Sequence, residues 1–288
     1  EQMKKVLVIG CKGMAGHVIK TYLESLNNYQ VIGIARNVNS NKNLFNLDVS
    51  DTNKLEQILK ESSFDIVINC IGLLNKTAED NPELAVWFNS YFPHLLSNFG
   101  NKYGFKLIHI STDCVFSGKE GGYKEDSFKN GNGFYAQSKA LGEVINNKDL
   151  TFRTSIIGPE LKYDGIGLFH WFMNQENEIS GFSKAYWTGV TTLELAEGIN
   201  HSIQQDLKGL YHFVNESKIS KYDLINIFNQ NFRDNKIKIT EDSTYKIDKS
   251  LISTRNDFKY NVSSYTDMIF KMKQWMSQYN ENYNHYKY

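Results

Sequence analysis

The chain has 288 residues, of which 22% are charged and 41% hydrophobic, a composition typical of a globular protein with one large domain or two unequal lobes. A formal net charge of zero gives no electrostatic reason to expect nucleic acid or a membrane surface as a partner. The three cysteines form no C-x-x-C pattern, which argues against a disulfide framework or a metal site, and no apolar stretch reaches the ~20 residues of a membrane span. We therefore expect a cytoplasmic protein without a signal peptide.

The first structural signal is an apolar run from Val6 to Ile9, which has the length and branching of a buried parallel strand. It ends at Gly10, and Gly13 and Gly16 follow as a helical pattern begins. Such glycines allow a tight turn, a close approach of pyrophosphate to the backbone, and close packing of helix on strand. We predict a dinucleotide-binding turn, and the alternative is a tight turn that binds nothing.

A second strand is predicted over residues 31–35, and Arg36 follows it. Dinucleotide folds often have an acidic residue at this position for the adenosine ribose, whereas a cation suits a 2′-phosphate. Arg36 therefore favours NADP, with NAD as the alternative. Further on, Asp48 is a candidate for the adenine amino group and Val49 for the adenine ring, and a helix is predicted over 52–61.

The next buried strand ends in Cys70, Ile71 and Gly72. Open α/β folds bind ligands at the carboxyl edge of the sheet, so these three residues are predicted to border the cofactor. A long helix is expected over 83–103. Asn89 lies inside it, where asparagine is mildly unfavourable, so its side chain either has a specific partner or is simply exposed.

Another strand, over 106–110, leads into the polar residues Thr112 and Asp113. Downstream, Tyr135 and Lys139 are four residues apart, which places both on one face of a helix. An ammonium beside a phenol lowers the pKa of the phenol, which then exchanges a proton with a carbonyl or alcohol. Alone, this spacing is a common accident, but after a dinucleotide turn it predicts a catalytic site.

Beyond residue 157 the alternation of strands and helices weakens, and we place a lobe boundary there. The predicted organisation is a dinucleotide-binding domain over 3–157, a substrate lobe over 158–279 that is interleaved with the first, and a frayed tail over 280–288. Within the second lobe the sequence predicts helices over 167–174, 193–205 (capped by Thr192), 221–231 and 268–279, and strands near 186–192 and 210–214.

Taken together, these motifs resemble those of an extended short-chain dehydrogenase/reductase, and more narrowly of the dTDP-4-dehydrorhamnose reductase family of nucleotide-sugar reductases. The matching residues are Gly10-x-x-Gly13-x-x-Gly16, Asp48-Val49, Ser111-Thr112-Asp113-x-Val115-Phe116-x-Gly118, Tyr135-x-x-x-Lys139-x-x-Gly142-Glu143, Arg153-Thr154-Ser155 and Gly189-Val190-Thr191. The resemblance implies an α/β fold: a Rossmann-type doubly wound parallel sheet with a smaller C-terminal α/β substrate lobe.

The resemblance also implies roles. Gly13, Met14 and Ala15 would face the pyrophosphate of NADP or NAD. Tyr135 would donate a proton to the keto oxygen at C4 of a nucleotide-diphospho-sugar, Lys139 would lower the pKa of Tyr135 and hold the nicotinamide ribose, Thr112 would orient the carbonyl and Asp113 would contact the sugar. The expected contacts of the substrate are completed by Ile156, Trp187 and Arg255, and the expected assembly is a homodimer.

Two positions depart from the family pattern. Cys114 stands where the family usually has tyrosine, and Ile156 where it often has tryptophan, so neither the sugar nor the nucleotide follows from the resemblance. Dehydratases of the superfamily typically carry Asp-Glu after the threonine, and Asp113-Cys114 argues against dehydration. A nucleotide-sugar epimerase and a non-catalytic, NADP-binding regulatory subunit remain the alternatives to a reductase.

Overall fold

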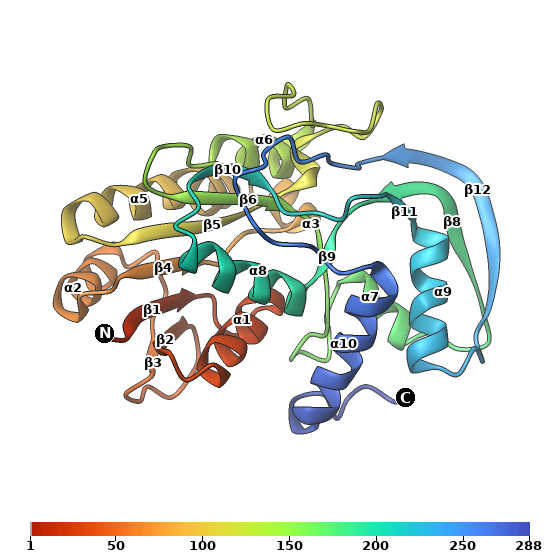
Figure 1. The fold of residues 1–288 in the computed structure, drawn as a ribbon, viewed down its shortest axis with the longest axis horizontal. Coiled ribbons are helices and arrows are strands. Elements are labelled where there is room, and N and C mark those ends of the chain that lie inside the picture. Colours follow the sequence, from red (N-terminus) through yellow and green to blue (C-terminus); the bar gives the residue numbers. More distant parts are fainter. Residues whose placement is uncertain (1) are drawn as a thin grey trace.

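A sheet of seven parallel strands forms the centre of the molecule, a computed structural model that describes residues 2–288 (Figure 1). The strands are short runs of branched apolar residues, and because helices cover both faces of the sheet, most of these side chains are buried. In spatial order the strands are β10 (Gly209–His212), β6 (Leu150–Thr154), β5 (Lys106–Thr112), β4 (Ile66–Asn69), β1 (Lys4–Ile9), β2 (Tyr29–Ala35) and β3 (Leu44–Asn46).

The strand order reverses between β1 and β4. From β1 the chain winds outward through β2 and β3, and then returns to β4 on the other side of β1. The carboxyl ends of β1 and β4 therefore flank the crevice in which open α/β sheets bind ligands. This topology confirms the predicted Rossmann-type doubly wound sheet.

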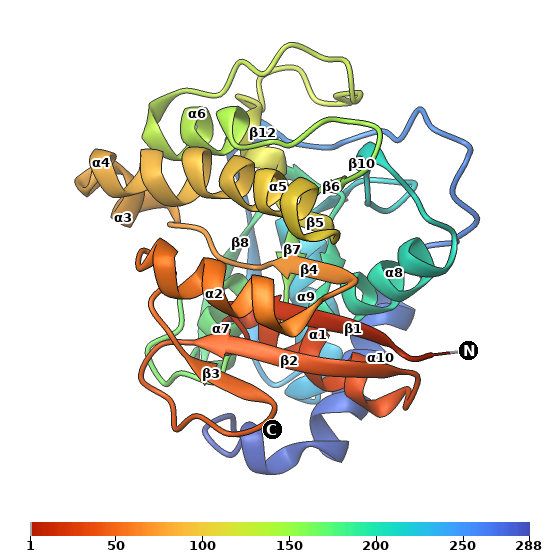
Figure 2. The ribbon, with the colours of Figure 1, turned by 90° about the vertical axis from the view of Figure 1, so that its left-hand side faces the viewer.

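Helices cover both faces of this sheet (Figures 1 and 2). Helices α1 (Met14–Ser25) and α8 (Thr192–Gln204) pack against each other and share a hydrophobic core on one face. Helices α2 (Thr52–Ser62) and α5 (Phe92–Tyr103) pack on the other face with a second core. Helix α6 (Gly133–Leu141) follows the loop after β5 and brings Tyr135 and Lys139 to the edge of the sheet.

A smaller lobe lies beside the sheet, on the right of Figure 1. Its own sheet has the order β11-β8-β12, and helix α9 packs against β8. The elements of this lobe are β8 (Glu178–Trp187), β11 (Ile219–Ser220), β12 (Lys238–Asp248), α7 (Leu168–Met173), α9 (Lys221–Phe232) and α10 (Tyr265–Gln278), and β7 (Ile156–Ile157) pairs with β9 (Val190–Thr191) between the two lobes. The chain interleaves the lobes, since α8 and β10 return to the large sheet.

The helix predicted over 83–103 is interrupted by a π-helical turn. It consists of α4 (Pro82–Ala85), the π-helical segment η1 (Val86–Tyr91) and α5. The two remaining short elements before α6 are α3 (Asn75–Asp80) and the 3₁₀ turn η2 (Asp113–Val115), and a last 3₁₀ turn is η3 (Asn280–Asn282).

Two expectations about chain ends and caps are wrong. Helix α8 begins at Thr192, and its cap is Thr191, whose hydroxyl accepts a hydrogen bond from the Glu194 N–H at 3.1 Å. The tail over 280–288 is not frayed: Tyr283 and Tyr286 are only 2% and 5% exposed. Both rings pack into the main hydrophobic core and both hydroxyls have hydrogen-bond partners, so the polar composition of the tail misled the prediction.

Candidate functional site

The glycine turn after β1 has the geometry of a phosphate-binding loop. Gly10 adopts a φ of +81°, which favours glycine, and a Cβ on Gly16 would collide with the carbonyl oxygen of Gly10. Helix α1 then begins at Met14 with Gly13 as its cap, and Gly13 offers no side chain to the first N–H groups of the helix. Those N–H groups and the helix dipole are available for an anion, so this turn fits the pyrophosphate of a dinucleotide.

The end of β4 lies directly against this turn. The Cys70 N–H donates to the Ile9 carbonyl at 3.0 Å, and a Cβ on Gly10 would lie 3.0 Å from Cγ1 of Ile71. Burial raises the pKa of the Cys70 thiol to about 12, so it stays protonated at neutral pH. Cys70, Ile71 and the exposed Gly72 therefore follow directly after β4, beside the glycine turn.

Asn89 has specific partners. Its amide bridges both backbone groups of Leu73, accepting from the N–H at 2.8 Å and donating to the carbonyl at 2.9 Å. It also donates to the Ser138 hydroxyl at 3.1 Å, on the helix that carries Tyr135 and Lys139. The π-helical segment η1 presents this side chain, and such segments are frequent at functional sites. Asn89 thus ties the segment after β4 to helix α6.

Thr112, Tyr135 and Lys139 meet at the carboxyl edge of the sheet. Thr112 is the last residue of β5. The ammonium of Lys139, a residue of α6, donates a hydrogen bond to the Ile110 carbonyl of β5 at 3.0 Å. The start of α6 is held by Glu79 of α3, whose carboxylate accepts from the N–H groups of Phe134 and Tyr135, both at 3.1 Å. A carboxylate at a helix N-terminus is favoured by the dipole. Glu79 escaped the sequence analysis because it is 56 residues from Tyr135.

The expected lowering of the Tyr135 pKa is not found. Burial raises the pKa of Tyr135, electrostatic interactions with Cys114 and Asp113 raise it further, and only the Thr112 hydroxyl acts in the opposite direction. Burial also lowers the pKa of Lys139 to about 8, although Glu143 opposes this. Lys139 is not among the groups that shift the pKa of Tyr135, and Tyr135 is a protonated phenol at neutral pH.

Two lysines of the smaller lobe, which the sequence analysis missed, lie next to Asp113 and Cys114. The Lys249 ammonium is 3.5 Å from the Cys114 sulfur, and both Lys221 and Lys249 interact electrostatically with Asp113. Asp113 is buried, and burial raises its pKa against the opposing effect of the two lysines. Only the packing of the two lobes brings these residues together, so no local pattern in the sequence indicates them.

Of the residues predicted to contact the adenosine moiety, Arg36 and Asp48 are exposed and Val49 is buried. Arg36 is exposed directly after β2, next to the glycine turn, because the N–H groups of Gly10 and Cys11 both donate to the Ile34 carbonyl. Asp48 is also exposed, and hydrogen bonds from Ser50 lower its pKa. The Val49 side chain, in contrast, is buried in the core beneath α2, so its predicted contact with the adenine ring does not fit this structure.

Of the three remaining predicted substrate contacts, Ile156 and Trp187 lie between the lobes and Arg255 does not. Ile156 is half-buried on β7. Trp187 is buried, and its indole N–H donates to the Ser155 hydroxyl at 2.7 Å.

The prediction for Arg255 is wrong. Its guanidinium pairs with Asp257 at 2.6 Å and donates to the carbonyls of Lys208 and Leu210, at the amino end of β10. The candidate site lies at the opposite edge of the sheet, because β10 and β6 are parallel and Thr112, Tyr135 and Lys139 lie at the carboxyl ends of the strands.

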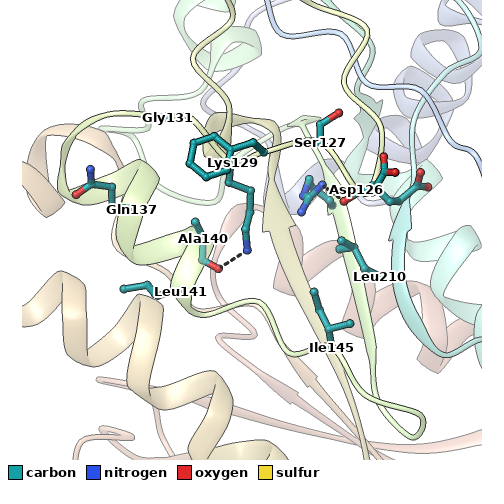
Figure 3. Close-up of a pocket in the computed structure, with 12 residues that line it drawn as sticks. Asp126, Ser127, Lys129, Gly131, Gln137, Ala140, Leu141, Ile145 and Leu210 are labelled. Carbon is teal, nitrogen blue, oxygen red and sulfur yellow. Dashed lines mark hydrogen bonds between the residues drawn. The ribbon is translucent and has the colours of Figure 1, made fainter.

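A separate hollow lies on the far side of α6 (Figure 3). Gln137, Ala140 and Leu141 line it, and on a helix these residues face away from Tyr135 and Lys139. Lys129 crosses it and donates to the Ala140 carbonyl at 3.0 Å (Figure 3). This hollow is therefore not part of the candidate site.

The fold and the glycine turn define the class: a Rossmann-type α/β protein of the extended short-chain dehydrogenase/reductase kind. The chain belongs to the family described as RmlD substrate binding domain, whose model matches residues 3–286. Among residues 2–288, no helix combines the length and the apolar character that a membrane crossing needs.

Three relatives illustrate the range of this family. The chain is 29% identical over 158 residues to the probable low-salt glycan biosynthesis reductase Agl14 of Haloferax volcanii, a match that spans 52% of each chain. It is 22% identical over 242 residues to methionine adenosyltransferase 2 subunit beta of Xenopus tropicalis, which covers 77% of this chain and 70% of that one. The dTDP-4-dehydrorhamnose reductase of Bacillus anthracis, solved in complex with NADP, has a similar fold with a TM-score of 0.79, 22% identity, and coverage of 93% of this chain and 98% of that one.

Proposed function

We propose that this protein reduces the 4-keto group of a nucleotide-diphospho-deoxysugar with NADPH, in the synthesis of deoxysugar or polysaccharide precursors. The observation that carries the proposal is the convergence of Thr112, Tyr135 and Lys139 at the carboxyl end of β5, whose neighbour β4 flanks the switch point of the sheet. The names of the Haloferax and Bacillus relatives support a reductase and NADP. NADH is the alternative reductant.

The cofactor is bound by residues of the first lobe. The N–H groups of Met14, Ala15 and Gly16 take the pyrophosphate, and Arg36 takes the 2′-phosphate. Lys139, placed beside Gly72 with its ammonium 3.6 Å from where a Cβ of that glycine would lie, holds the nicotinamide ribose. When bound, the reduced nicotinamide supplies a hydride to C4 of the sugar.

Tyr135 supplies the proton that balances this hydride. Its raised pKa keeps the phenol protonated at neutral pH, as a proton donor to the keto oxygen requires. The Thr112 hydroxyl donates to the same oxygen and fixes its position, and it is also the neighbour that favours the phenolate that remains. The C4 carbonyl thus gains one hydride and one proton and becomes an alcohol, after which solvent returns a proton to Tyr135.

The direct test is a turnover assay that follows the absorbance of reduced nicotinamide. Purified protein is mixed with NADPH or NADH and a panel of dTDP-, UDP- and GDP-4-keto-6-deoxy sugars. We expect loss of absorbance with one nucleotide. Tyr135→Phe should lower turnover by at least about a hundredfold while cofactor affinity stays within about twofold, since proton donation contributes 10²–10⁴. Tyr163→Phe, at an exposed tyrosine, is the matched control.

Other outcomes assign other functions. Exchange of sugar isomers without net loss of reduced cofactor would identify an epimerase. Cofactor binding with neither turnover nor exchange, and with a copurifying enzyme, would identify a regulatory subunit, which the resemblance to methionine adenosyltransferase 2 subunit beta makes the second candidate. Full turnover by Tyr135→Phe would contradict its role as the proton donor.

A further inference from the structure

Two lysines of the smaller lobe converge on the residues that follow Thr112. Lys221 is the first residue of α9, and Lys249 directly follows β12. The Lys249 ammonium is 3.5 Å from the Cys114 sulfur, and the Lys221 ammonium lies over the Trp187 ring at 5.0 Å from its centroid. The group therefore sits at the junction of the two lobes, next to the proposed catalytic threonine.

Positive charge exceeds negative charge in this group. Asp113 is the one carboxyl among the groups that influence either lysine electrostatically, and burial raises its pKa. Within residues 2–288, neither Lys221 nor Lys249 forms an ion pair with a carboxylate. The neighbouring Asp248 is already paired with Lys218 at 2.6 Å.

An excess of positive charge is energetically unfavourable where the charged groups have lost part of their hydration. Burial lowers the pKa of Lys221, which shows that its ammonium has lost much of its hydration. Lys221 is half-buried, with Asp113 as the nearby carboxyl, and an anion that enters the group offsets the lost hydration of the ammonium. The indole beneath Lys221 offers partial compensation, since a cation is attracted to the face of an aromatic ring.

Among the residues of this group, Cys114 departs from the family pattern, which usually has tyrosine at this position. A thiol is much shorter than a phenol, and the Cys114 sulfur lies 3.4 Å from the Asp113 carboxylate. The Lys249 ammonium contacts the same thiol. A bulky neutral group is thus replaced by a small one flanked by two cations.

We propose that Lys221 and Lys249 form a subsite that binds an oxyanion of the substrate next to Asp113. This inference deepens the proposed function and rests on it, because it assumes a nucleotide-sugar substrate at this edge of the sheet. Two sources of the oxyanion share the same chemistry: the diphosphate of the nucleotide and a carboxylate on the sugar. The subsite contributes to binding and orientation, while proton transfer belongs to Tyr135.

Binding of probe nucleotides, measured by calorimetry without cofactor or turnover, tests the subsite. The probes are dTDP, UDP and GDP, each compared with its nucleoside, and UDP-glucuronate compared with UDP-glucose. The variants are Lys221→Met and Lys249→Met, which keep the apolar stem and remove the charge. Lys246→Met removes an exposed charge three residues from Lys249 and is the control. Lys221→Arg and Lys249→Arg, which retain the charge, separate loss of charge from misfolding.

The expected result is a loss of at least tenfold in affinity for the anionic probe in each methionine variant. A loss of affinity for a nucleoside diphosphate identifies the diphosphate as the oxyanion that the subsite binds. A loss of affinity confined to UDP-glucuronate identifies a sugar carboxylate as that oxyanion. The affinity should be largely restored by arginine and weakened by added salt.

Two results would overturn the subsite. One is wild-type protein that binds none of the anionic probes more tightly than its uncharged or less charged partner. The other is a set of methionine variants that bind all probes as the Lys246→Met control does. Because these measurements involve no hydride transfer, a protein that binds the probes but reduces no keto sugar would contradict the proposed function and leave the subsite standing.

Discussion

At the scale of single residues, Lys139 combines a functional position with a cost in stability. Burial lowers its pKa to about 8 from an ordinary value of 10.5, so folding weakens its hold on the proton. Below pH 8 the lysine is charged in both the folded and the unfolded state, and the full penalty applies. Between pH 8 and 10.5 the folded protein loses the proton first, and the penalty fades as the pH rises.

We therefore predict that Lys139→Met stabilises the ligand-free protein at pH 7 while it abolishes turnover. The free energy of unfolding should rise by about 1–3 kcal/mol, the upper limit being the full pKa shift and the lower value allowing for the lost hydrogen bond to Ile110. Urea denaturation at pH 7 and pH 10 measures the gain, which should shrink at the higher pH. Lys102→Met, at an exposed lysine, is the control. A variant less stable than wild type at pH 7 would contradict the prediction.

Arg36 is the residue on which the choice of cofactor depends. It is exposed at the end of β2, beside the glycine turn. Arg36→Glu should lower the ratio of kcat/KM for NADPH to that for NADH by at least about tenfold, since a carboxylate repels the 2′-phosphate and suits a free ribose hydroxyl. Steady-state assays with both cofactors measure the ratio. Lys42→Glu makes the same change of charge on the following loop, and an equal effect of both variants would point to net charge alone.

At the scale of elements, a buried ionic network joins α6 to the sheet. The Arg153 guanidinium of β6 donates to both carboxylate oxygens of Glu143 at 2.9 and 2.8 Å, and the Ser111 hydroxyl of β5 donates to the same carboxylate at 2.7 Å. Arg153 also donates to Nε2 of His212 on β10 at 2.7 Å. Two neighbouring strands thus share the carboxylate of Glu143, which lies directly after α6.

Arg153→Met should lower the free energy of unfolding by about 3–5 kcal/mol, because Glu143 is left as a buried carboxylate without its main partner. The double variant Arg153→Met/Glu143→Leu should recover a large part of that loss, since it removes both charges. Chemical denaturation of wild type, Arg153→Met, Glu143→Leu and the double variant completes a double-mutant cycle. A loss below about 1 kcal/mol in Arg153→Met would show that water replaces the arginine.

Local sequence patterns predicted the strands, turn and helix that carry the candidate site. They did not predict the strand and the side chains whose positions depend on contacts between residues far apart in the sequence. The run Val6–Ile9, its glycines and the spacing of Tyr135 and Lys139 each encode a structure within a few residues, and the structure has them as predicted. Strand β12 was missed, because its residues are mostly exposed or half-buried and show no apolar alternation. The partners Glu79, Lys221 and Lys249 also lie far from the site in sequence.

At the scale of the whole molecule, the C-terminal tail connects the two lobes. The Tyr283 hydroxyl bonds to Nε2 of His17 on α1 at 2.8 Å, and the Tyr286 hydroxyl bonds to Nδ1 of His170 on α7 at 2.6 Å. Tyr286 also accepts from the Glu160 N–H at 2.9 Å, on the loop that leads to α7. That loop reaches the glycine turn, since a Cβ on Gly167 would lie 3.3 Å from the Met14 sulfur.

His17, which is buried and hydrogen-bonded to the tail, is a source of acid sensitivity. Burial lowers the pKa of His17 to about 4, against an ordinary value of 6.5. Above pH 6.5 the histidine is neutral in both states and has no effect. As the pH falls from 6.5 towards 4, His17 becomes protonated in the unfolded state but stays neutral in the folded state, so the free energy of unfolding decreases. At pH 5 this one group lowers it by about 2 kcal/mol.

Deletion of residues 280–288 should therefore destabilise the protein more at pH 7 than at pH 5. At pH 7 the shortened protein should be less stable than the full chain, since two buried tyrosines and their hydrogen bonds are lost. At pH 5 the difference should be smaller, because an uncovered His17 regains an ordinary pKa and no longer favours the unfolded state. Urea denaturation of both proteins at the two pH values measures this, with His17→Gln in the full chain as the control. If the difference is unchanged at pH 5, then the tail does not set the pKa of His17, and the helix and core beneath it bury the ring on their own.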